Sequence, residues 1–129
     1  MKIDVELAGK KQVKAHFDGF TVLTDQPGDS GGDGAAPAPF DLFLASIATC
    51  AGFFVQSFCQ ARGISTEGIR ISQVSEWDEK THLIPEIQIR LQLPESFPEK
   101  YRSSVLAAVN GCSVKKHLVN PPKVVVAIE

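Results

Sequence analysis

The 129-residue sequence has no excess of charge of either sign. It carries 13 basic and 15 acidic side chains, for a net charge of -2. A protein that binds nucleic acid usually shows a basic excess, and a disordered tail usually shows a block of like charge. The N-terminus also lacks the apolar stretch of a secretory signal, because its first residues alternate as a strand does. We therefore expect a cytoplasmic globular protein that binds no nucleic acid.

Cysteine is scarce, with three residues in the chain and no C-x-x-C pair. An odd count without such pairs fits neither a disulfide framework nor a zinc site. A metal site formed by Cys50, Cys112 and His117 is disfavoured, because these ligands are scattered along the sequence. We expect no metal and no cofactor. Any disulfide in the cytosol is more often redox-active than structural.

The longest apolar run covers residues 40–59 and is about long enough to be weighed as a membrane span. Polar residues interrupt it (Asp41, Ser46, Thr49, Gln56 and Ser57), and no basic anchors flank its N-terminal end. We predict instead a buried central helix that starts after Pro39 and ends at Arg62-Gly63.

Short strands are predicted on the N-terminal side of this helix. Residues 3–7, 13–17 and 20–22 alternate apolar and polar side chains, and Asp18-Gly19 predicts a tight hairpin turn. Residues 24–38 form a long loop, which could be either a functional loop or a plain spacer.

On the C-terminal side, residues 69–77 and 87–93 predict two more strands. Ser96 and Glu99 have the spacing of a capping box, so a second helix is expected to begin there and to end at Asn110-Gly111. A short helical stretch follows Cys112, and residues 124–128 predict a last strand. The order indicates a single α+β domain, residues 1–129.

Cys50 allows two interpretations. A thiol in an apolar helix is usually a packing residue, and burial raises its pKa and makes it inert. A reactive Cys50 would therefore need a positive group beside it. Cys59 lies nine residues later, on the opposite side of the helix, and is interpreted as packing.

Cys112 is the better candidate for a thiolate on local grounds. It directly precedes a short helix, whose N-terminal N–H groups would stabilise a negative sulfur. Three basic side chains follow it closely in sequence: Lys115, Lys116 and His117.

Two segments carry a resemblance to a known family. One is a Gly/Pro-rich loop that leads into "P-x-D-L-F-L-A-S-I-A-T-C", ending at Cys50, and the other is "N-G-C-S-V-K-K-H-L", which contains Cys112. With the order of elements and the valine-rich C-terminal segment, these motifs resemble the OsmC/Ohr family of thiol-dependent peroxidases over nearly the whole chain.

The resemblance implies an OsmC-like fold, in which strands flank a long buried central helix and two chains form an intertwined homodimer. It implies that Cys50 attacks an organic hydroperoxide and becomes a sulfenic acid, and that Cys112 then forms a disulfide with it. A dithiol would reduce this disulfide, completing an antioxidant, stress-response activity. Phe43, Phe53 and Phe54 would supply an apolar substrate pocket.

The sequence departs from the family pattern at two positions. Family peroxidases use an arginine from the N-terminal strand region, paired with a glutamate just after the helix-initiating proline. Here the first arginine is Arg62, Phe40 follows Pro39, and the acid comes one place later as Asp41. Asp41 is either a supporting catalytic residue or a first-turn acid of the helix. Without a guanidinium, a pKa above about 8.5 is expected for Cys50.

These departures resemble a less-characterised OsmC-like branch. They leave a second hypothesis open, in which the chain is a non-catalytic OsmC-like module. Such a module would act as a redox sensor, or bind an apolar small molecule at the dimer interface.

Overall fold

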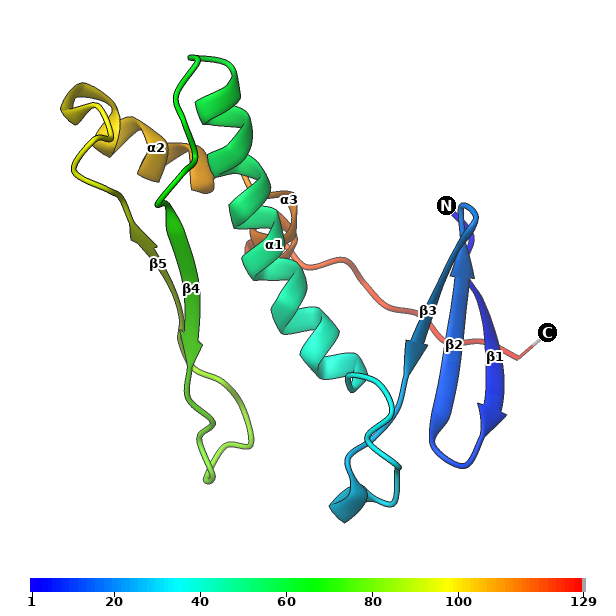
Figure 1. The fold of residues 1–129 in the computed structure, drawn as a ribbon. Helices are drawn as coiled ribbons and strands as arrows, with labels where there is room; N and C mark the ends of the chain where they lie inside the picture. Colours follow the sequence, from blue (N-terminus) through cyan, green and yellow to red (C-terminus); the bar gives the residue numbers. More distant parts are fainter. Residues whose placement is uncertain (129) are drawn as a thin grey trace. The chain divides into compact units, whose positions relative to one another are not determined.

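The computed structural model describes residues 1–128 and divides into two compact units, residues 1–45 and residues 46–129. The first unit contains β1 (Asp4–Gly9), β2 (Gln12–Phe17), β3 (Phe20–Thr24), the 3-10 turn η1 (Gly28–Ser30) and the start of α1 (Pro39–Gln60). The second contains the rest of α1, then β4 (Arg70–Ser75), β5 (Ile87–Gln92), the 3-10 turn η2 (Glu99–Tyr101), α2 (Arg102–Val109) and α3 (Ser113–Val119) (Figure 1).

The three strands predicted in the N-terminal unit form an antiparallel sheet with strand order β1-β2-β3. Ala15 of β2 pairs with Val5 on one side and with Val22 on the other. The predicted hairpin turn is confirmed, because Asp18 and Gly19 have φ angles of 48° and 80°. Two consecutive residues with positive φ give the turn the twist that matches antiparallel strands.

The loop after β3 is an ordered turn system around a buried carboxylate. Asp25 is almost fully buried, and its oxygens accept hydrogen bonds from the backbone N–H groups of Gln26, Asp33 and Ala35. The N–H groups of Ala35 and Gln26 hold the pKa of Asp25 below its usual value. This long loop is therefore ordered, and a function for it stays a prediction.

In the C-terminal unit, β4 and β5 pair antiparallel, with Ile71 opposite Leu91. Figure 1 shows these strands running alongside α1, with α2 crossing near the end of α1. The buried core of this unit joins α1 to the segment around α2 and consists of Val55, Phe58, Cys59, Phe97 and Val105. Isoleucine and leucine side chains of both strands pack against this core.

Helix α1 forms where the sequence predicts it, but only one face is buried in the chain. Five of its residues are buried (Ile47, Ala51, Val55, Phe58 and Cys59), and they repeat at the spacing of a single helix face. By length and composition α1 could also cross a membrane. Its buried face packs into the core of the C-terminal unit.

Two details of the prediction are wrong. Ser96 and Glu99 form no capping box: a 3-10 turn starts at Glu99, its carboxylate pairs with Arg102, and α2 begins only at Arg102. Residues 121–128 form no strand, and Val124, Val126 and Ile128 are almost fully exposed. A strand is held by hydrogen bonds to a neighbouring strand, and this segment pairs with none in the described chain.

Candidate redox site

Three elements of the C-terminal unit bring Cys50 and Cys112 together. Cys50 lies on α1, and Cys112 follows the Asn110-Gly111 end of α2 as the N-cap residue of α3. The Cys112 thiol donates a hydrogen bond to the Cys50 sulfur. The backbone N–H groups of Ser113 and Val114, in the first turn of α3, also donate to this sulfur. All three cysteines are free thiols.

The pKa values of the two thiols shift in opposite directions. Burial acts to raise the pKa of Cys50, but the hydrogen bonds from Cys112, Val114 and Ser113 outweigh it, so the pKa is lowered. Burial raises the pKa of Cys112, and so does its hydrogen bond to Cys50. Cys50 is therefore the thiol that loses its proton first, with Cys112 as the donor that stabilises the thiolate.

This arrangement corrects two expectations. Cys50 was expected to have a raised pKa unless a cation lay beside it, and its pKa is lowered although none of the groups that lower it carries a charge. Cys112 was expected to be the thiolate at the helix N-terminus. It is 2% exposed, and burial and Cys50 raise its pKa although the N–H groups of Lys115 and Val114 act to lower it. The N–H groups of Val114 and Ser113 also lower the pKa of Cys50. A helix N-terminus favours an anion, and the N-terminus of α3 favours the thiolate of Cys50, which lies on α1.

Hydrogen bonds from Lys115 hold the segment around Cys112. The Cys112 sulfur accepts a hydrogen bond from the backbone N–H of Lys115, at 3.4 Å, and so caps α3. The Lys115 ammonium in turn donates to the Asn110 side-chain oxygen at 2.6 Å, which links the residues before and after Cys112. His117 points back along α3, with Nδ1 2.8 Å from the Ser113 carbonyl oxygen.

Cys59 lies away from this pair. It is fully buried in the core with Val55 and Phe58, and burial raises the pKa of its thiol. Nine residues after Cys50, it faces the opposite side of α1, and its interpretation as a packing residue agrees with this position. No cluster of three histidine, cysteine or acidic residues that could hold a metal occurs within residues 1–128.

The remaining candidate residues lie on α1. Phe53 and Phe54 follow Cys50 by about one helical turn, and their rings meet edge to face, with centroids 5.3 Å apart. Phe53 is 61% exposed. Phe43 belongs to the N-terminal unit, where its ring stacks on Phe40. The role of these rings in binding a substrate stays a prediction.

Asp41 also belongs to the N-terminal unit. Its carboxylate accepts a hydrogen bond of 3.0 Å from the backbone N–H of Ala38, the residue just before α1. An acid at the third helical position that reaches back in this way is half of a capping box. The contact therefore agrees with the interpretation of Asp41 as a first-turn acid.

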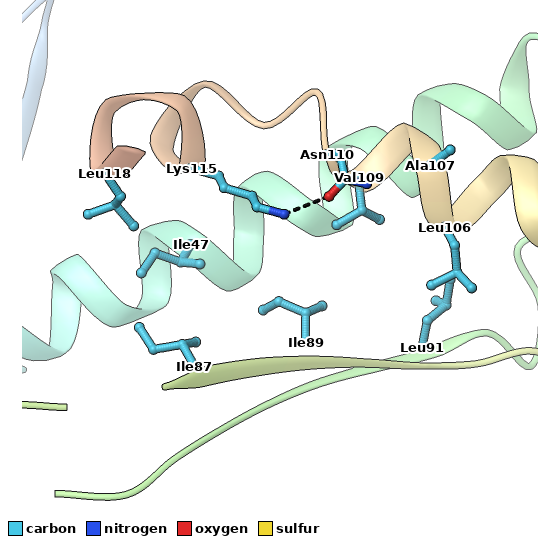
Figure 2. Close-up of a pocket in the computed structure, with 10 residues that line it drawn as sticks. All are labelled: Ile47, Ile87, Ile89, Leu91, Leu106, Ala107, Val109, Asn110, Lys115 and Leu118. Atoms are coloured by element: carbon cyan, nitrogen blue, oxygen red, sulfur yellow. Dashed lines mark hydrogen bonds between the residues drawn. The ribbon is translucent and has the colours of Figure 1, made fainter. Parts of the chain in front are cut away.

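A cavity of about 560 Å³ borders the cysteine segment, and the sequence did not point to it. Figure 2 shows its walls: Ile47 of α1, Ile87, Ile89 and Leu91 of β5, Leu106, Ala107 and Val109 of α2, and Asn110, Lys115 and Leu118. These residues are spread over four elements, so no local motif marks them. Ile47 lies one turn before Cys50, and Asn110 and Lys115 flank Cys112.

The chain was compared with known proteins. The sequence profile of the family described as OsmC-like protein matches residues 31–127. No match is found among curated proteins. Among solved structures, one from Psychrobacter arcticus, described as a protein of osmotic stress induction and detoxification response, superposes with a TM-score of 0.74 at 21% identity. That match covers 90% of this chain and 86% of the other.

Two further structures carry a name that refers to hydroperoxides. The organic hydroperoxide resistance protein OsmC of Legionella pneumophila has a TM-score of 0.56 at 15% identity, covering 92% of this chain and 89% of that one. The organic hydroperoxide resistance protein OhrB of Bacillus subtilis has a TM-score of 0.54 at 16% identity, covering 94% and 93%. These likenesses establish the fold, and together with the profile match over residues 31–127 they show that this chain belongs to the OsmC-like protein family.

Proposed function

We propose that this protein is a thiol-dependent peroxidase that reduces organic hydroperoxides through Cys50. The observation that carries the proposal is the hydrogen bond from the Cys112 thiol to the Cys50 sulfur, with the pKa of Cys50 lowered and that of Cys112 raised. A peroxidatic thiol must be ionised at neutral pH, and a resolving thiol must lie within reach of it. Two structural relatives named as organic hydroperoxide resistance proteins support the choice of substrate.

The first step forms a sulfenic acid on Cys50. Its thiolate attacks the outer peroxide oxygen, an S–O bond forms, and the O–O bond breaks. The substrate leaves as an alkoxide and takes up a proton to become an alcohol. The sulfur loses two electrons and the peroxide gains them. The N–H groups of Val114 and Ser113 lower the pKa of Cys50 and so favour the thiolate that makes this attack.

The second step forms the disulfide and the third removes it. The Cys112 sulfur attacks the Cys50 sulfenic sulfur, an S–S bond forms, and the hydroxyl group leaves as water with the Cys112 proton. An external dithiol then reduces the disulfide by two successive exchanges and is itself oxidised to a disulfide. The protein returns to the free thiols that the structure contains.

We assign binding of the organic part of the substrate to the side chains of Phe43, Phe53 and Phe54. We also propose that the protein is a homodimer located in the cytoplasm. The exposed ring of Phe53, one turn from Cys50, supports this assignment. We propose that Asp41 supports the site indirectly. Its contact with Ala38 caps the first turn of α1, the helix that carries Cys50.

Turnover measurements test the proposal. Cumene hydroperoxide and hydrogen peroxide are compared as substrates, with dihydrolipoamide as the reductant. We expect the organic hydroperoxide to be consumed faster, and Cys50→Ser to abolish the activity. Cys59→Ala removes a thiol from the same helix without touching the pair and is the matched control, with activity expected within about twofold of the unaltered chain. Equal activity in Cys50→Ser would refute the proposal.

A further inference from the structure

Gly111, the residue before Cys112, lies against the ring of Phe54. A Cβ atom placed on Gly111 would stand 2.8 Å from Cε1 and 3.3 Å from Cδ1 of this ring, and 3.2 Å from the Ala108 carbonyl oxygen. Carbon atoms without a bond between them make their best contact at about 3.5–4.0 Å. The glycine therefore leaves room for the ring, and no side chain fits at this position unless the ring moves.

The glycine is there for space, since its backbone conformation does not require it. Six glycines in the chain have positive φ angles, among them Gly19 and Gly63, and Gly111 is not one of them. The N–H of Gly111 bonds to the Ala108 carbonyl in an ordinary turn that ends α2. Alanine could adopt this backbone, so the contact with Phe54 is the physical reason for a glycine here.

The same ring is tied to Cys50. Phe54 follows Cys50 by four residues on α1, so the two side chains are neighbours on one face of the helix. Its orientation is fixed on one side by the edge-to-face contact with Phe53. Phe54 thus contacts Gly111, the residue before Cys112, and lies beside Cys50 on α1.

Lys115 stabilises the segment around Cys112 through two hydrogen bonds. Its backbone N–H bonds to the Cys112 sulfur, and its ammonium bonds to the Asn110 oxygen. These bonds hold the turn together but do not set its distance from α1. The ring of Phe54, next to Gly111, limits how closely the turn can approach the helix at this point.

We propose that Phe54 is a positioning residue, whose ring, pressed against Gly111, sets the separation of the Cys112 and Cys50 sulfurs. The inference rests on the redox pairing in the proposed function. It predicts that the size of the side chains at 54 and 111 controls how readily the disulfide closes. It also predicts that the two positions compensate, because a methyl group at 111 needs the space that the ring occupies.

The test measures the effective concentration of Cys50 for Cys112 in redox buffers of reduced and oxidised dithiothreitol, in a Cys59→Ala background. We expect Phe54→Ala and Gly111→Ala each to lower it about tenfold, because small displacements of reacting atoms cost this much or more. The double variant should be closer to the parent than Gly111→Ala alone. Phe40→Ala removes an aromatic ring near the start of the same helix, far along it from Phe54, and should stay within about twofold.

Phe54→Leu provides a milder change should Phe54→Ala fail to fold, as judged by near-ultraviolet circular dichroism. It is expected to weaken closure less than tenfold and still to relieve the effect of Gly111→Ala. An effective concentration unchanged in both Phe54 variants would overturn the inference. A double variant whose fold-loss equals the product of the two single fold-losses would overturn it as well.

This equilibrium needs no peroxide, so the two proposals fail separately. A disulfide that forms and follows the predicted compensation, in a protein that consumes no hydroperoxide, would refute the peroxidase and retain the role of Phe54. Hydroperoxide turnover with a disulfide insensitive to Phe54 would do the reverse. A parent protein in which Cys50 and Cys112 form no disulfide would refute both.

Discussion

Uncharged hydrogen-bond donors lower the pKa of Cys50, an effect that was expected to need a guanidinium group. The Cys112 thiol and the first-turn N–H groups of α3 lower the pKa of Cys50 against the effect of burial. Hydrogen bonds to the charged form of an acid favour that form, as a nearby cation does. The absence of an arginine before Arg62 therefore does not by itself make Cys50 inert.

This explanation predicts the pH dependence of alkylation. The thiolate reacts with iodoacetamide, so a lowered pKa places the rise in rate at a lower pH than for a free cysteine. Cys112→Ala removes one donor and should move the rise to higher pH. Cys112→Ser keeps a hydroxyl donor and should move it little. Rates for Cys50 are followed by mass spectrometry, and identical profiles for the two variants would contradict the role of Cys112.

Asp41 offers a second test at the residue scale. Asp41→Ala removes the contact with Ala38 and should lower the free energy of unfolding by about 1 kcal/mol. Asp41→Asn keeps an oxygen acceptor and should retain stability and turnover. Urea unfolding and hydroperoxide consumption are measured on both variants. Normal stability with lost turnover in Asp41→Asn would instead show that the carboxylate charge takes part in catalysis.

At the scale of elements, local patterns predicted much of the secondary structure. Alternation gave β1 to β5, the pair Asp18-Gly19 gave the hairpin, and apolar length gave α1. The two wrong predictions have different causes. Residues 121–128 have the pattern of a strand but no partner in the chain, and the start of α2 is displaced by a 3-10 turn at Glu99.

The candidate site was predictable only in part, because it depends on contacts between segments that are far apart in sequence. Both cysteines could be named from their motifs, and the N-terminus of α3 was expected to stabilise a thiolate. Which sulfur receives its N–H groups depends on how α1 packs beside α3, and this packing has no local signal. The cavity walls and the contact of Phe54 with Gly111 likewise join segments far apart in sequence.

Helix α2 provides a stability test with an internal control. Val105 is fully buried in the core, whereas its neighbour Leu106 is 56% exposed on the cavity wall. We expect Val105→Ala to lower the free energy of unfolding by about 2 kcal/mol, through lost burial and the cavity that remains. Leu106→Ala should change it by no more than about 0.5 kcal/mol. Urea denaturation checks both, and equal effects would contradict the assignment of the core.

At the scale of the whole molecule, much apolar surface is exposed in the single chain. It includes side chains of β1 (Val5 and Leu7), of α1 (Phe53) and of the C-terminal segment (Val124, Val126 and Ile128). Large exposed apolar side chains are found in each of the two units, and contiguous apolar patches on soluble proteins often mark interaction sites. These exposed side chains support the proposed homodimer, which would cover some of them.

The dimer leads to a prediction about the C-terminal segment. Light scattering after size exclusion should give a mass of twice 13.9 kDa. Val126→Glu places a charge on a side chain that is 90% exposed in the single chain, and should shift the protein toward monomer at micromolar concentration. Lys123→Glu changes a charged residue of the same segment and should leave the dimer intact. A monomeric parent protein would contradict the proposal.

The most direct test of the central claim is intact mass and non-reducing peptide mapping after one equivalent of cumene hydroperoxide. The account predicts rapid formation of a Cys50–Cys112 disulfide, and a trapped sulfenic acid on Cys50 in the Cys112→Ser variant. Cys50→Ser should show neither product. No modification of Cys50, or slow oxidation spread over all three cysteines, would contradict the claim that these two thiols form a peroxidatic pair.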